Sequence, residues 1–358
     1  MERAIGVARR SLEELSAGSI VAPLRPPFEL PGGAITLVMP GHRPATRDLG
    51  VKIVSVHPRN PGRGLPTVHA IVVVIDTMTG VPVGLIEGNA LTALRTGAAV
   101  GAATDLLARP DARTLAVFGA GVQARAALRA IRAVRQIEEI RLISRSGASA
   151  ERVAAELTEK SEVRSQESHE RDGERAGGGV GEESPDTAHS PSRSPVLPRA
   201  HSPTRPFAAS GARVVVARSP GEAIRSADII VTATTSATPV FAGAEVGPGV
   251  HVNAVGAFRP TERELDSDLV ARARIVVDTR EGCLAEAGDL LIPIATGLLD
   301  SKDVAELGEV GLGRQPGRTS AEQITVYKSV GHAALDVAMA GEAIRQAEAL
   351  GLGQIVDL

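Results

Sequence analysis

Residues 114–124 read TLAVFGAGVQA, and this short stretch decides the fold. Five strand-forming residues lead into a glycine turn, and residues that favour a helix follow. Gly119 allows the tight turn, Gly121 lets a pyrophosphate approach the backbone, and the small Ala124 lets helix and strand pack closely. The stretch therefore predicts the first strand, turn and helix of a dinucleotide-binding domain, with phosphates on the N–H groups of the helix N-terminus. We expect cofactor contacts from Gly119, Gly121, Val122, Gln123 and Ala124.

The strand expected over residues 140–143 indicates which cofactor fits. It ends in Ser144, Arg145 and Ser146. Domains that bind NAD usually have an Asp or Glu here, which accepts from the 2′-hydroxyl of the ribose, whereas NADP-binding domains have an Arg nearby. Arg145 can offer a planar fork of N–H groups to a 2′-phosphate. We therefore predict NADPH as the cofactor, with NADH possible, and a solvated surface arginine is the alternative reading of Arg145.

Further apolar segments continue an alternation of strands and helices that is typical of a doubly wound parallel sheet. The expected strands span residues 212–217, 228–233, 250–255 and 275–278. Ligands bind at the carboxyl ends of such strands, so residues there are candidates to border the cofactor. These candidates are Thr232, Thr234, Thr235, Val255 and Gly256. Ordinary turn chemistry is the alternative for the threonines.

The N-terminal part follows a different pattern, with hairpin-like strands that indicate an antiparallel or mixed sheet. These strands are expected over residues 34–39, 49–56, 67–76 and 84–87. Residues 324–349 read as one long helix that returns to pack on this sheet. We therefore expect an α/β protein with a Rossmann domain over residues 111–319. A second, α+β domain would be formed by both termini, residues 1–110 and 320–358.

Composition excludes several classes of function. The net charge of −3 gives no basic surface for nucleic acid, and five Phe, one Tyr and no Trp leave few platforms for base stacking. No apolar run reaches membrane-spanning length, and the N-terminus lacks a signal-peptide pattern. The single cysteine, Cys283, suits a reducing compartment. We expect a cytoplasmic protein that acts on a small molecule, without nucleic-acid or membrane partners.

Residues 160–206 differ from the rest of the chain, with mixed charge, repeated Ser-Pro and a run of Gly. Such a segment cannot bury enough apolar surface to offset its ordering entropy. We predict a disordered insertion that loops out between a helix over residues 148–159 and the strand over 212–217. The spacing of the histidines within it shows no metal-ligand pattern, and no metal site is predicted.

Three cationic residues interrupt apolar segments of the N-terminal half. Lys52 lies in the strand LGVKIVSV, Arg95 in the helix ALTALRTGAAVGAA, and Arg25 between prolines and the first strand. Burial of such charges is costly unless they meet an anion. From spacing alone, a pocket for a carboxylate and a set of structural salt bridges both remain possible.

Segments across nearly the whole chain, apart from the insertion, resemble the ornithine cyclodeaminase/mu-crystallin family. They include GNALTALRTGAAVGAATDLLARPDARTLAVFGAGVQARAAL, GVKIVSV, GLPTVHAIVVVIDTMTG, HVNAVGAFRPTEREL, EAGDL and GRTSAEQITVYKSVG. The resemblance implies a homodimer, in which the domain built from both termini binds substrate and dimerises. It also implies that Arg25, Lys52 and Arg95 bind a substrate carboxylate. Met39 then matches a pocket residue, and Lys328 a residue near the nicotinamide.

The resemblance leaves the reaction open among several amino-acid enzymes. Family cyclodeaminases carry a catalytic Asp where this chain has Phe258, and a phenyl ring cannot take a proton. Arg145 resembles the NADPH-using ketimine reductases of the family. We therefore predict reduction of a cyclic imino acid, Δ1-pyrroline-2-carboxylate or Δ1-piperideine-2-carboxylate, to L-proline or L-pipecolate, with Lys52 as the candidate proton donor. A cyclodeaminase, an alanine dehydrogenase-type enzyme and a mu-crystallin-like binding protein with little turnover remain alternatives.

Overall fold

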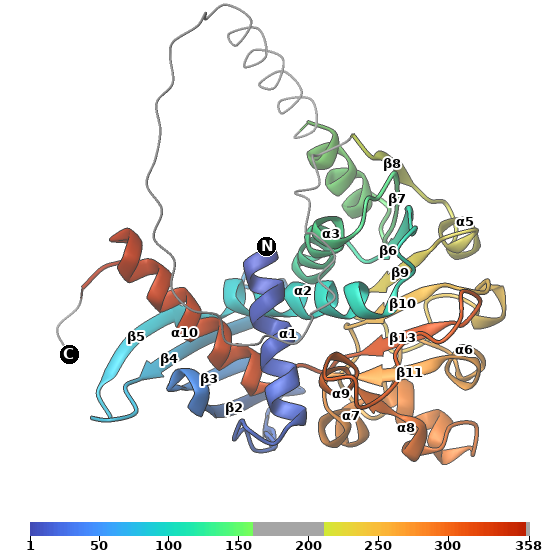
Figure 1. Cartoon of the computed structure of the whole chain (residues 1–358). Coiled ribbons are helices and arrows are strands. Elements are labelled where there is room, and N and C mark those ends of the chain that lie inside the picture. Colours follow the sequence, from blue (N-terminus) through green and yellow to red (C-terminus); the bar gives the residue numbers. More distant parts are fainter. Residues whose placement is uncertain (160–210, 356–358) are drawn as a thin grey trace, which may run out of the picture.

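The computed structural model describes residues 1–159 and 211–355, which contain two β-sheets. One sheet is antiparallel with strand order β1-β2-β3-β4-β5, and the other has the order β12-β11-β13-β10-β9-β6-β7-β8. Every strand pairing in the second sheet is parallel. The two sheets lie side by side, with helices between them (Figure 1). The predicted fold class, a Rossmann-type doubly wound sheet with a second, antiparallel domain, is confirmed.

The antiparallel sheet consists of β1 (Phe28–Leu30), β2 (Ala34–Arg43), β3 (Asp48–Val56), β4 (Val68–Ile75) and β5 (Pro82–Glu87). Its inner face packs on α10 (Ala333–Leu350), and α1 (Glu2–Ser16) packs beside α10. The strand surface approaches the helix closely, because a Cβ at Gly41 would lie only 3.0 Å from a methyl group of Val337. The helix therefore covers one face of the sheet, whereas on the other face Val38, Ile53 and Ile71 are exposed in the described part of the chain.

The parallel sheet consists of β6 (Thr114–Phe118), β7 (Glu139–Ile143), β8 (Arg213–Val216), β9 (Ile229–Thr232), β10 (His251–Ala254), β11 (Arg274–Val277), β12 (Ala305–Glu306) and β13 (Thr325–Lys328). The remaining helices are α2 (Gly88–Leu107), α3 (Val122–Val134), a segment over 148–159, α5 (Pro220–Ile224), α6 (Ser267–Arg272), α7 (Arg280–Glu286), α8 (Gly288–Ala295) and α9 (Leu307–Gly311). Short 3₁₀ turns are η1 (Pro44–Thr46), η2 (Asn60–Arg63), η3 (Gly243–Glu245) and η4 (Ser301–Asp303). Strand β6 lies between β7 and β9, where the strand order reverses and a doubly wound sheet opens a crevice.

The long helix predicted over residues 324–349 is wrong in its first part. Residues 325–328 form β13, which pairs with β10 and β11 in the middle of the parallel sheet, and α10 begins only at Ala333. A short apolar run can be a buried strand or a buried helix, and its periodicity does not distinguish them. The β-branched and aromatic residues of Thr325-Val326-Tyr327 favour the strand. The domain boundary predicted at 319/320 therefore falls too early, since β13 belongs to the parallel sheet.

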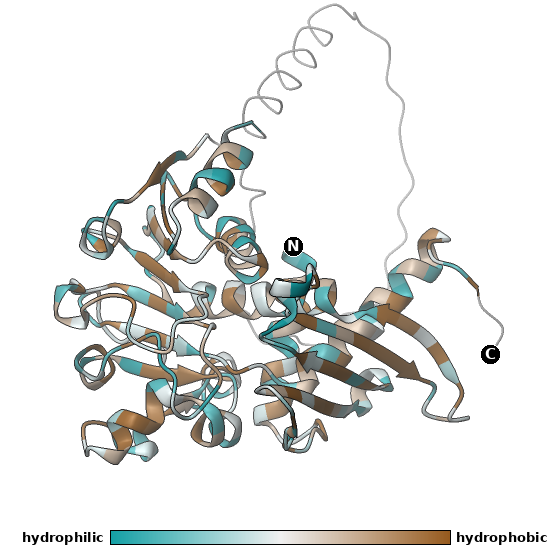
Figure 2. Ribbon diagram, turned by 180° about the vertical axis from the view of Figure 1, so that it is seen from behind, coloured by the Kyte–Doolittle hydropathy of each residue, from teal (hydrophilic) through white to brown (hydrophobic). Residues whose placement is uncertain are grey.

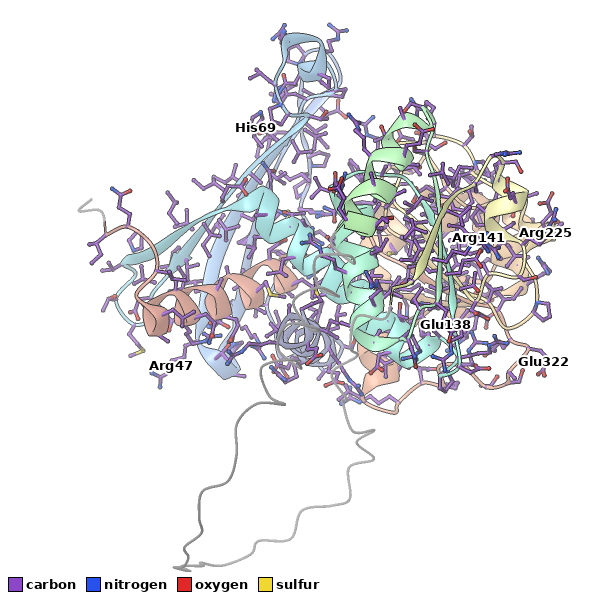
Figure 3. The ribbon with its side chains drawn as sticks, turned by 90° about the horizontal axis from the view of Figure 1, so that it is seen from above. Arg47, His69, Glu138, Arg141, Arg225 and Glu322 are labelled. Atoms are coloured by element: carbon purple, nitrogen blue, oxygen red, sulfur yellow. The ribbon has the colours of Figure 1, made fainter. Side chains whose placement is uncertain are left out.

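Helix α2 links the two sheets and carries one of the predicted cations. The Glu87 side chain caps it by accepting from two backbone N–H groups of the first turn, at 2.9 and 2.7 Å. A Cβ at Gly97 would clash with the backbone of Ala126, so the small residue allows α3 to pack directly on α2. Figure 3 shows α2 running from the antiparallel sheet toward the parallel sheet. Arg95 is thereby buried where the two sheets meet.

The insertion predicted over residues 160–206 lies outside the described residues. In the part of the chain that the structure does describe, no helix combines the length and the apolar character needed to cross a membrane.

Candidate active site

A cleft of about 960 Å³ opens at the carboxyl ends of β6, β7 and β9. It lies at the predicted crevice of the doubly wound sheet. Seven of the residues predicted to border the cofactor line it: Gly119, Gly121, Ser144, Arg145, Ser146, Thr234 and Thr235. The two local sequence patterns, the glycine turn and the Ser-Arg-Ser strand end, thus face one cavity.

The glycine turn has the form that a pyrophosphate needs. Gly119 has a positive φ of 107°, and a Cβ there would clash with the backbone of Ala233. A Cβ at Gly121 would meet no heavy atom within 4 Å, so the backbone at this point faces open space. Helix α3 begins at Val122, and no side chain in the described part of the chain caps its N-terminus. Its first N–H groups are therefore available to an anion.

The end of β7 presents cationic and hydroxyl groups to the cleft. Arg145 is exposed, and among the described residues it forms no ion pair. Arg152, one turn into the following helix, also lines the cleft and donates to the Ser149 hydroxyl at 3.2 Å. The carboxylate of Glu156 is held by Arg125. Arg152 is an addition to the predicted set, and it lines the same cleft as Arg145.

Other predicted cofactor residues lie outside the cleft: Val122, Gln123, Ala124, Thr232, Val255, Gly256 and Lys328. The Thr232 hydroxyl donates to the buried Glu264 at 2.9 Å, and the Gly256 N–H donates to the same oxygen at 2.7 Å. Thr234 donates to the other oxygen of Glu264 through both its N–H and its hydroxyl, at 2.7 Å each. Glu264 therefore ties together the loops after β9 and β10, a role that sequence reasoning missed.

The predicted contact between Lys328 and the cofactor needs correction. Its side chain is fully buried, with Nζ 2.7 Å from Asp289 Oδ2 and 2.5 Å from the carbonyl oxygen of Ala257. Burial opposes the charge, but Asp289 and Glu264 outweigh it and raise the pKa of Lys328. Because Lys328 ends a buried strand rather than starting a helix, its amine is enclosed in a structural ion pair.

The four predicted substrate residues come together at the inner face of the antiparallel sheet. Met39 on β2 and Lys52 on β3 are cross-strand partners, and both are buried. Arg25 approaches the Met39 sulfur with one guanidinium nitrogen, at 3.5 Å. Lys52 Nζ and Arg95 Nε lie 3.0 and 3.1 Å from the same oxygen of Asp336, on α10. The cluster therefore unites three cations from distant parts of the sequence.

Charge in this cluster is unevenly balanced. Burial lowers the pKa of Lys52 to about 8, although Asp336 raises it, and Arg95 lowers it further. Burial acts to raise the pKa of Asp336, but Arg95 and Lys52 outweigh it and lower the pKa. One carboxylate thus serves two buried cations, and a second anion would complete the balance. Asp336 was not predicted from the sequence. Its carboxylate inside the apolar helix AALDVAMA is the feature that could have indicated a buried partner for the cations.

Arg25 already holds a carboxylate of the chain itself. Its Nη2 and Nε lie 3.0 and 3.3 Å from the two oxygens of Glu286, at the end of α7. Nη2 also donates to the carbonyl oxygen of Val330 at 2.6 Å. This two-point grip is the geometry in which a guanidinium recognises a carboxylate. Glu286 begins the EAGDL segment quoted above, but it was not predicted as a partner of Arg25, because nothing in that segment indicates which side chain it contacts.

The turn after β13 connects the cation cluster to the parallel sheet. Asp278, at the end of β11, accepts from the Ser329 hydroxyl at 2.7 Å and from the Gly331 N–H at 2.8 Å. Gly331 has a φ of 80°, and a Cβ there would clash with the guanidinium of Arg95. Since the carboxyl ends of parallel strands lie at one edge of a sheet, the cluster and the cleft share that edge.

His332 caps α10, where its ring nitrogen accepts from the N–H of Ala334 at 3.3 Å. Burial lowers the pKa of His332, against the opposing charge of Asp278.

Comparison with known sequences gives a consistent result. The model of the ornithine cyclodeaminase/mu-crystallin family matches residues 3–177 and 199–348. A Δ1-pyrroline-2-carboxylate reductase of Bacillus cereus is 35% identical over 360 residues, covering 100% of this chain and 95% of that protein. The ketimine reductase mu-crystallin of Mus musculus is 32% identical over 304 residues, covering 85% of this chain and 77% of that protein.

Solved structures of related enzymes have the same fold as this chain. The Δ1-pyrroline-2-carboxylate reductase of Thermococcus litoralis, in complex with NADH and L-proline, superposes with a TM-score of 0.83 at 34% identity, covering 99% of this chain and 96% of that one. An archaeal alanine dehydrogenase dimer with bound NAD gives a TM-score of 0.80 at 28% identity, covering 100% of this chain and 95% of that one. The chain therefore belongs to the ornithine cyclodeaminase/mu-crystallin family.

Proposed function

We propose that this chain reduces Δ1-pyrroline-2-carboxylate to L-proline with NADPH, and the related six-membered Δ1-piperideine-2-carboxylate to L-pipecolate. The broader class is that of its relatives, oxidoreductases that use a nicotinamide cofactor and act on C=N bonds. The proposal of a cyclic imino acid as substrate rests on one observation: Arg25, Lys52 and Arg95 converge on one buried site that holds too few anions to balance them. That site fits a small carboxylate.

The cleft fits a dinucleotide. Gly119 and Gly121 leave room for a pyrophosphate at the N-terminus of α3, where the helix dipole favours negative charge. Arg145 and Arg152 supply two cations at the end of β7, where a ribose 2′-phosphate would lie. These cations support NADPH over NADH. When bound, the reduced nicotinamide supplies a hydride, and the shared sheet edge would bring its ring toward the cation cluster.

Substrate binding falls to the three cations. Arg95 and Lys52, held on one oxygen of Asp336, can together take a carboxylate on their free sides, and Arg25 can close on it once Glu286 is displaced. Such fixation holds the C=N carbon where hydride can reach it. Met39, buried between Arg25 and Lys52, offers a sulfur and methyl surface to the apolar ring.

Reduction of a C=N bond also needs a proton on nitrogen, and Lys52 is the proposed donor. Burial lowers the pKa of Lys52 to about 8, so its ammonium group exists at neutral pH and can still release a proton. The reaction then balances: hydride joins carbon, the Lys52 proton joins nitrogen, and water restores the lysine. Phe258, after β10, offers no proton acceptor for the deamination that a cyclodeaminase performs.

We also propose a homodimer that packs through the open face of the antiparallel sheet. Figure 1 shows α10 in front of this sheet, and Figure 2, from behind, shows strands with no helix over them. Val38, Ile53 and Ile71 occupy one cross-strand row on that face and are exposed, and Leu85 extends the patch. Apolar surface of this extent on a sheet favours a partner of the same kind.

Initial rates of NADPH oxidation with each cyclic imino acid test the proposed reaction. Lys52→Met should lose at least about a hundredfold in kcat/KM, since the expected contribution of a positioned proton donor is about 10²–10⁴-fold. Lys302→Met, at an exposed lysine in η4, is the matched control and should retain full activity. Absence of turnover with both imines would refute the proposal, and sustained ammonia release from L-ornithine would favour a cyclodeaminase.

A further inference from the structure

Asp336 is a buried carboxylate that ties three separate elements together. It lies on α10, and one of its oxygens contacts Lys52 of β3 and Arg95 of α2. Its side chain is fully buried, and so, to within a few per cent, are its two partners. The second oxygen has no hydrogen-bond partner among the described residues. Within that part of the chain, its side chain therefore bonds to the two cations that we place at the substrate.

The two cations need this carboxylate to stay together. Lys52 and Arg95 repel one another, and both lie in a region where water cannot screen them. Arginine keeps its charge in any protein environment, whereas a buried lysine gives up its proton when no anion is near. Loss of the carboxylate would therefore discharge Lys52 and release both side chains from their common anchor.

We propose that Asp336 is a positioning residue of the reaction: it holds Lys52 and Arg95 side by side toward the substrate carboxylate and maintains the charge of Lys52. This inference rests on the proposed function, because it gives Lys52 the roles of carboxylate ligand and proton donor. Asp336 itself does not touch the reacting atoms and acts through the two cations.

The charged groups around Lys52 show which group would titrate at the alkaline side of the pH profile of activity. Asp336 faces it from α10, Arg95 from α2, and Arg25 from the segment before β1. Burial lowers the pKa of His332, at the start of α10. The charge of Asp336 raises this pKa and the charge of Arg25 lowers it. Arginine does not titrate in the working range, so a decline of activity near pH 8 reports the lysine.

The test is the pH profile of kcat/KM in Asp336→Asn, which removes the charge but keeps the shape. An opposite charge at this distance shifts a pKa by about 1–3 units, so the alkaline limb should move down by at least about one pH unit. Asp289→Asn is the matched control: Asp289 is equally buried and pairs with Lys328. It should lower stability without moving the limb. An unchanged limb in Asp336→Asn would overturn the proposal.

A second variant, Asp336→Glu, keeps the proposal testable if Asp336→Asn folds poorly. Asp336→Glu keeps the charge and displaces it, so the limb should stay at the wild-type pH while KM for the imino acid rises. A shift of the alkaline limb by a full pH unit in Asp336→Glu would contradict the role assigned to Asp336.

A readout without turnover separates this proposal from the proposed function. The chain has four lysines, so ¹³C-labelled lysine gives few side-chain signals, and Lys52→Met assigns the signal of Lys52. Its titration midpoint should fall by at least about one unit in Asp336→Asn and not in Asp289→Asn. A wild-type enzyme that reduces no cyclic imine would end the proposed function, whereas an unmoved Lys52 titration would end the role of Asp336.

Discussion

Replacement of Glu286 by Gln should make the enzyme bind its substrate more tightly. In the structure Glu286 occupies the guanidinium of Arg25 through two contacts, at 3.0 and 3.3 Å. A substrate carboxylate needs the same donors, so it must first displace Glu286. Gln keeps the length and one acceptor oxygen of the side chain but removes the charge, which weakens the internal competitor while leaving Arg25 in place.

The size of the effect follows from the exposure of the pair. A hydrogen bond to a charged group contributes about 1.5–3 kcal/mol, and an exposed ion pair about 0–1 kcal/mol. The side chains of Arg25 and Glu286 are 11% and 24% exposed, so the pair lies between these cases, and we take about 1 kcal/mol. This corresponds to a decrease of about fivefold in KM for Δ1-pyrroline-2-carboxylate, with a smaller change in kcat.

Initial rates at saturating NADPH measure this KM, and the dissociation constant of L-proline checks the same change without turnover. Glu309→Gln is the control, because Glu309 pairs with Arg280 at the opposite end of α7 and touches none of the three cations. An unchanged or increased KM in Glu286→Gln, with Glu309→Gln normal, would show that Glu286 supports Arg25 rather than competing with substrate.

Three further predictions concern the cofactor, the dimer and the response to acid. Arg145→Ala should raise KM for NADPH at least about tenfold more than KM for NADH, since a charge-assisted contact to the 2′-phosphate contributes about 1.5–3 kcal/mol. Equal increases in the two KM values would refute the assignment of Arg145 to the 2′-phosphate. Arg129→Ala, at an exposed arginine on α3, is the control. Ile53→Glu places a charge in the exposed apolar row, so sedimentation should show a monomer, whereas a wild-type monomer would contradict the proposed dimer. Burial lowers the pKa of His251 to about 3, below its ordinary 6.5, so the unfolded chain takes up the proton first and stability is lost as pH falls below 6.5. Chemical denaturation should show about 2 kcal/mol less stability from this group at pH 5 than above pH 7, and His251→Gln should flatten that dependence.

Features encoded by neighbouring residues were predictable from the sequence. The turn at Gly119 and Gly121 and the strand end at Arg145 each lie within a few residues, and the structure places both on one cleft. The antiparallel strands also follow from local alternation, although β2 runs on to Arg43 because it pairs with the start of β3.

Features that depend on distant partners were not predictable. The cost of burying Lys52 and Arg95 indicated that some anion must be near, but not that Asp336, more than two hundred residues away, supplies it. Glu286 and Glu264 were missed for the same reason. The error over residues 324–332 has another cause: β13 is buried on both faces, so the alternation that marks a half-exposed strand is absent.

Transfer of a label from the cofactor to L-proline shows directly whether this chain reduces the cyclic imino acid. The enzyme is incubated with Δ1-pyrroline-2-carboxylate and NADPH in which both hydrogens on the reactive carbon of the nicotinamide are replaced by deuterium. If the three cations hold the imino acid for hydride transfer, L-proline should appear with one deuterium at the carbon that bears the carboxylate, one equivalent for each NADPH consumed. Arg95→Met should abolish this transfer. Oxidation of NADPH without labelled L-proline, or no oxidation at all, would show that the chain does not catalyse this reduction.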